Sequence, residues 1–548
     1  MTTGSFARRR ALVAVAALLL AVLLAGYVVF TQLDPRGSSG ASGTSTPTGS
    51  STPSVAPSTD GTAQGFYSQK VTWVQCTAAE VTLDVITPPK DLSPYQCATL
   101  SAPLDWDNPG GGTISLRIAV YHGAAGNSRG LLFYNLGGPG GAAVKSLSYQ
   151  VTQSLGKKLV SNYDIVALDP RGTGESTPIV CMTDKQRDAY NAEDSDSSDA
   201  GETPQQIVAR AERIMGDVGA GCTKHSGDIA AHADTVTAAK DFDMARAVLG
   251  QKTLNYLGYS YGTFLGATYA GLFPDKVGRF VLDGALDPSM SVNEVSDLQM
   301  KGFEASLEHW VEDCQAGSGC PFSGGTDAGV KALASFVDRL ASSPLATSDS
   351  SRPLTQSLGL TAIIGCMYST SSYSTLTQAM QQAIGSSDGS MLLRLADYFN
   401  DRNDDGTYAS TSTDAMIAIN SLDYPAVGTV DQWAADAATL KADLPILGQF
   451  SGYASAGLSA WPFKGSATRQ AISANGAAPI VVVGTTHDPA TPYVMAQNLA
   501  KQLSSGVLVT NEGWNHTAYS KSASSCITGA IEGYFVAGTV PQSGLTCQ

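Results

Sequence analysis

The sequence predicts an α/β fold, with a mostly parallel, doubly wound sheet and a mainly helical segment inserted late in the chain. Short apolar runs rich in β-branched residues alternate with stretches whose apolar residues recur at helical spacing. The predicted strands are apolar almost throughout, which indicates a sheet covered by helices on both faces. The alternation stops near residue 289 and resumes near residue 479, so the segment between them is the predicted insertion.

The elements follow from these patterns in chain order. Gly and Pro end the apolar runs, as they do at strand and helix ends. The strands we predict are Thr113–Gly123, Gly130–Gly138, Tyr163–Gly172, Thr253–Ser260, Gly278–Pro288, Pro479–Asp488 and Gly506–His516. The main helices we predict are His232–Gly250 and Tyr261–Phe273, with one helix between the last two strands and one after them.

Five regions result. Residues 1–35 hold a basic stub and an apolar segment, and residues 36–65 form a linker. Residues 66–288 form the first part of the α/β core, residues 289–478 the helical lid, and residues 479–548 the last part of the core.

The N-terminal region predicts a location outside the cytoplasm. Three arginines precede Ala11–Phe30, twenty uncharged and mostly apolar residues that are long enough to span a bilayer. The arginines should stay in the cytoplasm, so the rest of the chain is expected on the other side. The segment is predicted to be an uncleaved membrane anchor; the alternative is a cleaved signal peptide, after which the protein is secreted. Residues 36–65, rich in Ser, Thr, Gly and Pro, are expected to be a disordered tether.

Composition excludes some partners and cofactors. The net charge is −15 in 548 residues and no basic stripe is present, which argues against nucleic acid. The nine cysteines show neither CxxC pairs nor Cys/His metal spacing, so we expect disulfides and no metal or organic cofactor. Sequence does not fix the pairing; the predicted pairs are Cys76–Cys97, Cys181–Cys222, Cys314–Cys320 and Cys526–Cys547, with Cys366 a buried free thiol.

Ser260 is the candidate nucleophile. It lies in Gly258-Tyr-Ser-Tyr-Gly262, a G-x-S-x-G pattern that follows a predicted strand and precedes a predicted helix. Glycines suit such a strand-to-helix turn because side chains there would collide. Ser387 lies in a second match to the pattern but follows a helix-like stretch, so we disfavour it.

A nucleophilic serine needs a base, a group that orients the base, and donors for an oxyanion. His516 and Asp488 each follow a late predicted strand and give the chain order Ser, Asp, His. His487 is the rival base, and Thr491 either supports Asp488 and His516 or caps a helix. The oxyanion donors we predict are the backbone N–H groups of Tyr261 and Gly138, with Gly137 as the alternative to Gly138.

Several stretches form a recognisable combination of motifs. They are LGGPGG (136–141), DPRGTGES (169–176), GYSYGTFLGATYAGLFPDKV (258–277), VLDGALDP (281–288), GTTHDPATPY (484–493) and the His516 loop. Together they resemble the α/β-hydrolases of the secreted tripeptidyl-aminopeptidase type, which are related to proline iminopeptidases. The chain departs from the iminopeptidases at Leu136, where they carry histidine, so proline specificity does not follow.

The resemblance implies a Ser260–His516–Asp488 triad that cleaves short peptides, tripeptides in particular, from free N-termini through an acyl-enzyme. An exopeptidase also needs carboxylates for the substrate ammonium, and Asp287 and Glu175 are candidates. Two alternatives stay open: a carboxylic-ester hydrolase acting on extracellular lipid or polymer esters, and a catalytically inert, tethered binding protein.

Overall fold

The computed structural model describes residues 61–548 except residues 85, 124–125, 127, 193–201 and 466–468. The apolar segment Ala11–Phe30 and almost all of the linker therefore lie outside the described residues. Among the helices that are described, none combines the length and the apolar character needed to cross a bilayer.

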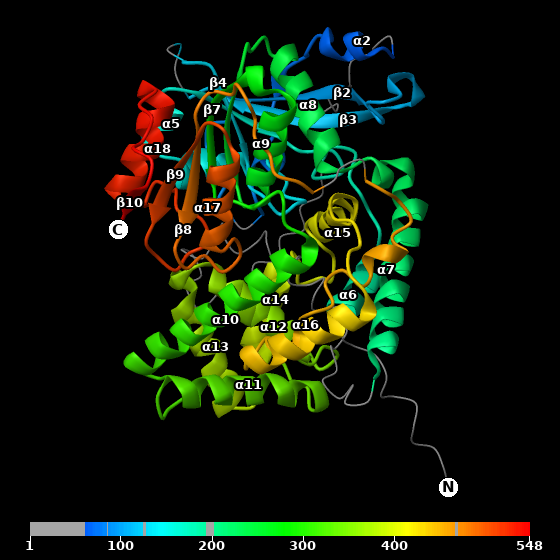
Figure 1. The fold of residues 1–548 in the computed structure, drawn as a ribbon, viewed down its shortest axis with the longest axis vertical. Coiled ribbons are helices and arrows are strands. Elements are labelled where there is room, and N and C mark those ends of the chain that lie inside the picture. The colour runs from blue at the N-terminus through cyan, green and yellow to red at the C-terminus, as the bar shows by residue number, and fades with distance from the viewer. Residues whose placement is uncertain (1–60, 85, 124–125, 127, 193–201, 466–468) are drawn as a thin grey trace.

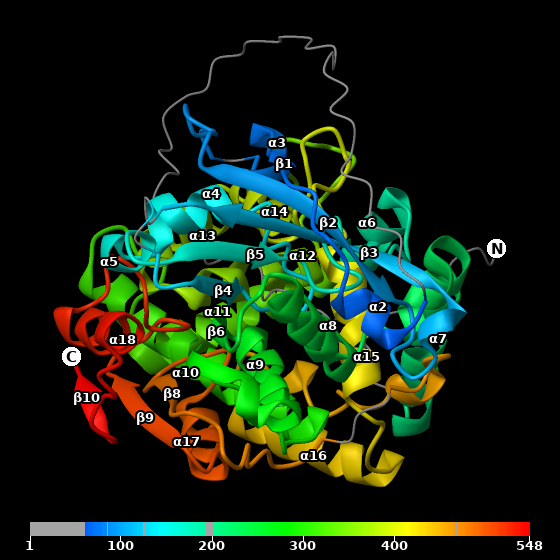
Figure 2. The same cartoon turned by 90° about the horizontal axis from the view of Figure 1, so that it is seen from above.

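The core is a sheet of ten strands in the order β1-β2-β3-β5-β4-β6-β7-β8-β9-β10. The strands β4 to β10 are parallel to one another. At one edge of the sheet, β1, β2 and β3 pair in antiparallel order, and β3 is also antiparallel to β5. Figure 2 shows this edge in blue and the opposite edge in red. The strands are β1 (Val74–Gln75), β2 (Tyr95–Pro103), β3 (Thr113–Tyr121), β4 (Leu131–Asn135), β5 (Asp164–Leu168), β6 (Leu254–Tyr259), β7 (Val277–Asp283), β8 (Ile480–Thr485), β9 (Gly506–Asn511) and β10 (Leu545–Cys547).

The mostly parallel sheet confirms the predicted fold class, and all seven predicted strands are present. Their apolar side chains are buried on both faces of the sheet, where they join two separate hydrophobic cores. In β8, Ile480 and Val482 belong to the core on one face, and Val481 and Val483 belong to the core on the other. The helices α8 (Thr235–Val248), α9 (Tyr261–Leu272) and α17 (Tyr493–Gln502) cover the first face. The helices α5 (Lys157–Val160) and α18 (Ser525–Ala537) cover the second.

Three strands were not predicted: β1, β2 and β10. β1 and β10 are only two and three residues long. β2 mixes Ser, Thr, Gln and Pro with its apolar residues, although eight of its nine residues are buried by pairing with β3 and by the N-terminal helices. Its burial comes from tertiary contacts and leaves no clear apolar run in the sequence.

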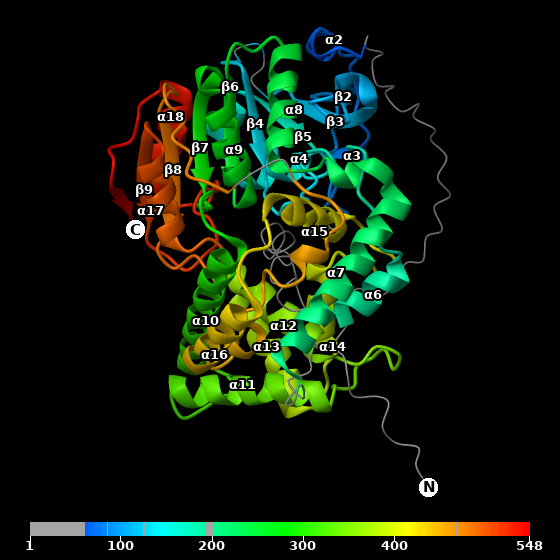
Figure 3. The ribbon, with the colours of Figure 1, turned by 45° about the vertical axis from the view of Figure 1, so that its right-hand side comes forward.

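Between β7 and β8 the chain forms a helical cap with an apolar core of its own, which includes Trp310, Phe336 and Leu393. Figures 1 and 3 show the cap as a layer below the sheet, with α15 between the two. The cap helices are α10 (Val292–Ala316), α11 (Thr326–Ser342), α12 (Gln356–Gly365), α13 (Tyr373–Gly385), α14 (Ser390–Phe399), α15 (Ser412–Asp423) and α16 (Val430–Asp443).

Two helices earlier in the chain also lie against the cap. We assigned residues 66–288 to the α/β core, but α6 (Asp184–Ala192) contacts α12, and α7 (Pro204–Ser226) contacts α15 and α16. The amphipathic α7 buries its apolar face beside cap residues such as Trp433 and Trp461. The cap therefore has a part that precedes Ser260 in the chain.

The disulfide prediction is confirmed. The structure pairs Cys76 with Cys97, Cys181 with Cys222, Cys314 with Cys320 and Cys526 with Cys547. Cys366 is a buried free thiol, and burial raises its pKa.

Candidate active site

Ser260 lies on a sharp turn between β6 and α9. Its φ of 54° is a left-handed value that is rare outside glycine. Gly258 and Gly262 make this turn possible: a Cβ at 258 would lie 2.4 Å from the Gly262 carbonyl oxygen, and one at 262 would lie 2.8 Å from the Asn135 carbonyl oxygen. The G-x-S-x-G spacing thus reflects backbone crowding that only glycine tolerates.

Asp488 and His516 lie on the loops after β8 and β9, at the same sheet edge as Ser260. His516 Nδ1 is 2.8 Å from Asp488 Oδ1 and 2.9 Å from Oδ2. Asp488 also accepts hydrogen bonds from the backbone N–H groups of Ala490, Thr491 and Thr517. Thr491 Oγ1 donates to Asp488 Oδ2 at 2.9 Å and lies 3.3 Å from His516 Nδ1, as expected if it supports this pair. The cap residue of α17 is Pro492, so Thr491 does not cap that helix. These bonds hold the carboxylate in one orientation toward the imidazole.

The other ring nitrogen of His516 is free. Nε2 is buried and has no hydrogen-bond partner among the described residues, so no hydrogen bond to Ser260 Oγ is formed. Gly284, at the end of β7, lets the histidine loop approach, since a Cβ there would lie 3.3 Å from His516 Cε1. Hydrogen bonds of this kind often tighten only when substrate binds.

The turn after β4 lies directly beside the nucleophile. A Cβ on Gly137 would lie 2.9 Å from Ser260 Cβ and 3.2 Å from the Tyr261 nitrogen. The Gly137 N–H donates to Asn135 Oδ1 at 2.9 Å, so it is already used within the turn. Of the two candidates in this turn, Gly138 is therefore the better donor to pair with Tyr261, the first residue of α9.

A pocket opens at Ser260 between the sheet and the cap. Its walls include side chains from the cap helices α10 and α15, which the sequence analysis did not identify, because they lie within ordinary helical patterns. None of the residues that line the pocket is charged. They are Gly138, Pro139, Ser260, Tyr261, Phe264, Leu286, Val295, Gln299, Asn420, Tyr424 and Thr491.

The two predicted substrate carboxylates do not line this pocket. Asp287 is buried, and its Oδ1 accepts hydrogen bonds from Ser289 and Gln502. The Glu175 side chain is 59% exposed and pairs with Arg117 Nε at 3.2 Å. Both carboxylates are bound to partners that do not line the Ser260 pocket.

The rival residues lie in different surroundings. Ser387 is exposed in the turn between α13 and α14, with no strand before it. His487 is exposed and stacks on Trp514, with ring centroids 3.9 Å apart. Burial, followed by the nearby His309, lowers the pKa of His487.

Asp283, at the end of β7, also supports the site. Its carboxylate accepts hydrogen bonds from the N–H groups of Ala518 and Tyr519, just beyond His516, and its carbonyl oxygen accepts one from the Ser260 N–H. Burial raises the Asp283 pKa to about 6, against the lowering effect of these N–H donors, and the negative Asp488 raises it further. The stretch VLDGALDP was identified in the sequence as a motif. Its pattern does not indicate that Asp283 contacts Ala518, which lies 235 residues later in the chain.

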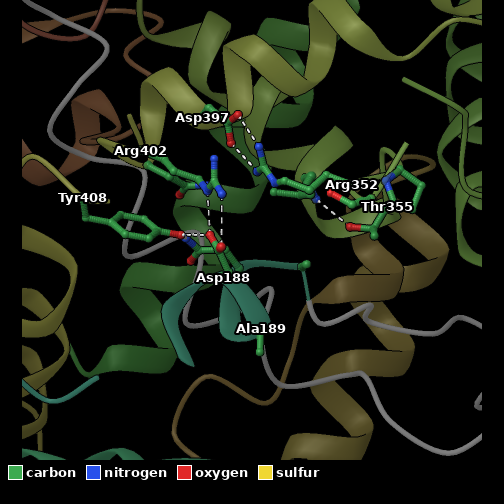
Figure 4. A pocket seen from close by; sticks show the side chains of 13 residues that line it. Asp188, Ala189, Arg352, Thr355, Asp397, Arg402 and Tyr408 are labelled. Carbon is green, nitrogen blue, oxygen red and sulfur yellow. Dashed lines mark hydrogen bonds and ion pairs between the residues drawn. The ribbon is translucent and has the colours of Figure 1, made fainter. Parts of the chain in front are cut away.

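A second pocket lies away from Ser260, where α6 meets the cap (Figure 4). Its charged groups are paired with one another. Arg402 forms two hydrogen bonds with Asp188, and Arg352 forms two with Asp397. Among the described residues, no group of His, Cys, Asp and Glu is arranged to hold a metal ion.

Comparison with known proteins agrees with the fold. Residues 131–522 match the family described as alpha/beta hydrolase fold. The chain is 36% identical over 464 residues to serine protease Hip1 of Mycobacterium tuberculosis H37Rv, covering 82% of this chain and 87% of that protein. It is 34% identical over 472 residues to carboxylesterase B of the same strain, covering 85% and 88%. It is 27% identical over 464 residues to tripeptidyl aminopeptidase of Streptomyces lividans, covering 83% and 84%.

The chain therefore belongs to the α/β-hydrolase family, which confirms the family predicted from the motifs.

Proposed function

We propose that the protein is a serine peptidase that releases short peptides, tripeptides in particular, from free N-termini outside the cytoplasm. The observation that carries the proposal is the His516–Asp488 contact, which leaves the second ring nitrogen of His516 without a hydrogen-bond partner among the described residues. Relatives named serine protease and tripeptidyl aminopeptidase support a peptide substrate.

In the proposed mechanism, His516 Nε2 takes the proton of Ser260 Oγ as the oxygen attacks the scissile carbonyl carbon. Asp488 accepts a hydrogen bond from His516 Nδ1–H and stabilises the imidazolium. The N–H groups of Tyr261 and Gly138 bind the oxyanion, a role worth about 3–4 kcal/mol of barrier per donor. His516 then protonates the leaving amine, and water hydrolyses the acyl-enzyme.

The test has two parts. A fluorophosphonate should label the wild-type protein and fail to label Ser260→Ala. Tri-alanine p-nitroanilide should be hydrolysed faster with a free N-terminus than with an acetylated one. Equal rates for the two forms exclude an aminopeptidase, and labelling that persists in Ser260→Ala excludes Ser260 as the nucleophile.

A carboxylic-ester hydrolase is the second candidate. The uncharged lining of the Ser260 pocket and the relative named carboxylesterase B favour it. Hydrolysis of p-nitrophenyl butyrate without cleavage of the tri-alanine substrate would support this candidate over the peptidase.

A further inference from the structure

The Asn420 side chain is an unsatisfied polar group inside the Ser260 pocket. Asn420 is only 8% exposed, and its Nδ2 is buried without a hydrogen-bond partner among the described residues. Burying an amide donor without a partner is unfavourable, so proteins rarely do it without a reason. Asn420 lines the same pocket as Ser260 and Gly138.

The position of Asn420 is held by its surroundings. It lies near the end of α15, which the cap places over the core (Figure 3). Three residues later, Asp423 accepts hydrogen bonds from the Thr235 N–H and hydroxyl at the start of α8, which fastens this end of the helix to the core. The unpaired amide is therefore presented by a rigid element.

The chemistry of the pocket defines what the amide can bind. The other walls are apolar or uncharged, among them Phe264, Leu286 and Val295. An acyl group attached to Ser260 Oγ has to occupy the space next to that atom. A peptide substrate offers, beyond the scissile carbonyl, a second and uncharged backbone carbonyl oxygen that can accept a hydrogen bond from the amide.

We propose that Asn420 is a substrate-binding residue, whose Nδ2 donates to a backbone carbonyl oxygen of the peptide segment on the acyl side of the scissile bond. This inference deepens the proposed function and rests on it. Substrate then supplies the partner that the free protein lacks, and the cap takes part in substrate selection through α15.

The test uses Asn420→Leu, which keeps the branched shape of the side chain and removes the donor, and Asn420→Ala, which removes the donor without adding volume. Wild type and variants are compared on tri-alanine p-nitroanilide and on p-nitrophenyl acetate, whose acyl group has no second carbonyl. We expect kcat/KM for the peptide to fall about tenfold and the acetate rate to stay within twofold. The melting temperature of Asn420→Leu should equal or exceed that of wild type, because an unpaired buried donor is removed.

The control is Ser421→Ala, on the same helix, equally buried at 8% exposure and absent from the pocket lining. It should leave both kcat/KM values unchanged. The proposal is overturned if the peptide and acetate rates fall together with the melting temperature, which is a structural effect, or if neither rate changes.

The experiment distinguishes failure of the proposed peptidase function from failure of the proposed role of Asn420. If wild type cleaves no peptide but hydrolyses the acetate, the peptidase proposal fails. The role of Asn420 is then decided with the p-nitrophenyl ester of N-acetylalanine, which has the second carbonyl. A selective loss on that ester supports the role, and an equal effect on both esters overturns it.

Discussion

Asp283 links two parts of the candidate site. Through its carbonyl oxygen it contacts the Ser260 N–H at 3.0 Å, and through its carboxylate it holds the backbone that follows His516. Hydrogen bonds to an ionised carboxylate are stronger than those between neutral groups. We therefore expect Asp283 to act through the position of His516, because its carboxylate binds the backbone after His516 and forms no hydrogen bond with the imidazole.

Replacing Asp283 by Asn tests this positioning role. The amide keeps one acceptor oxygen but places an NH2 group against backbone N–H donors, so the loop should shift. We expect kcat for p-nitrophenyl acetate to fall about tenfold while KM stays within twofold. The reason is that hydrogen bonds to a charged group contribute about 1.5–3 kcal/mol each. Steady-state kinetics measures kcat and KM separately. The control is Asp275→Asn, because Asp275 forms an exposed ion pair with Lys276. An unchanged kcat, or a loss confined to KM, contradicts the assignment.

At the scale of single residues, the sequence identified the groups that follow strands. Ser260 comes directly after β6, and Asp488 and His516 lie on the loops that follow β8 and β9. The carboxyl ends of parallel strands meet at one edge of a sheet. Asn420 and Gln299 could not be found in this way. They lie in helices of the insertion, where a polar residue reads as a solvated position until the packing of the cap onto the core is known.

At the scale of elements, α6 is fastened to the cap by two consecutive residues, Arg187 and Asp188. Figure 4 shows Asp188 with its partners Arg402 and Tyr408. Asp188 accepts hydrogen bonds from Arg402 and from the Tyr408 hydroxyl. Arg187 pairs with Asp414 at 2.8 Å and lies 4.7 Å above the Tyr408 ring centre. Burial acts to raise the pKa of Asp188, but Arg402 and Tyr408 outweigh it and lower the pKa. The cap residues bound by Arg187 and Asp188 lie in the segment just before α15 and in its first turn.

Asp188→Ala should loosen this attachment. A partly exposed bidentate pair with a third donor is worth about 1–2 kcal/mol, so the free energy of unfolding should fall by that amount. Denaturant titration measures it. Asp217→Ala, which removes the exposed partner of Arg213 on α7, should change stability little. Equal effects of the two substitutions would mean that the Asp188 contacts do not stabilise the cap.

Element types were predictable because they depend on local pattern, and helix α9 begins and ends within one residue of its predicted range. The association of α6 and α7 with the cap was not. Their amphipathic pattern shows that one face is buried, but the same pattern would serve for packing on the sheet or on other helices.

At the scale of the whole molecule, a buried carboxylate lies where cap and core meet. Asp423, the last residue of α15, accepts hydrogen bonds from Thr235, whose hydroxyl also contacts the Tyr261 hydroxyl at 2.5 Å. Burial raises the Asp423 pKa to about 7; the Thr235 hydrogen bonds lower it, the nearby Asp234 raises it, and Arg469 lowers it.

A pH dependence of stability follows. An unfolded aspartate has a pKa near 3.9, so between about pH 4 and pH 7 the folded protein holds a proton at Asp423 that the unfolded chain has released. This stabilisation is complete below about pH 4 and is lost as the pH rises through about 7. The melting temperature of Asp423→Asn minus that of wild type should therefore increase from pH 4.5 to pH 8, as measured by calorimetry. A difference that stays constant or decreases contradicts the assignment.

The sequence by itself determined the α/β class and the three segments in which the candidate nucleophile, base and acid follow strands. These depend on periodicity and on residues near one another in the chain. Only the tertiary structure decided how the cap sits on the core, which side chains it brings to Ser260, and that Asn420 keeps an unpaired amide in that pocket. Those features arise from contacts between segments hundreds of residues apart, and a local sequence pattern carries no information on which distant surface will cover it.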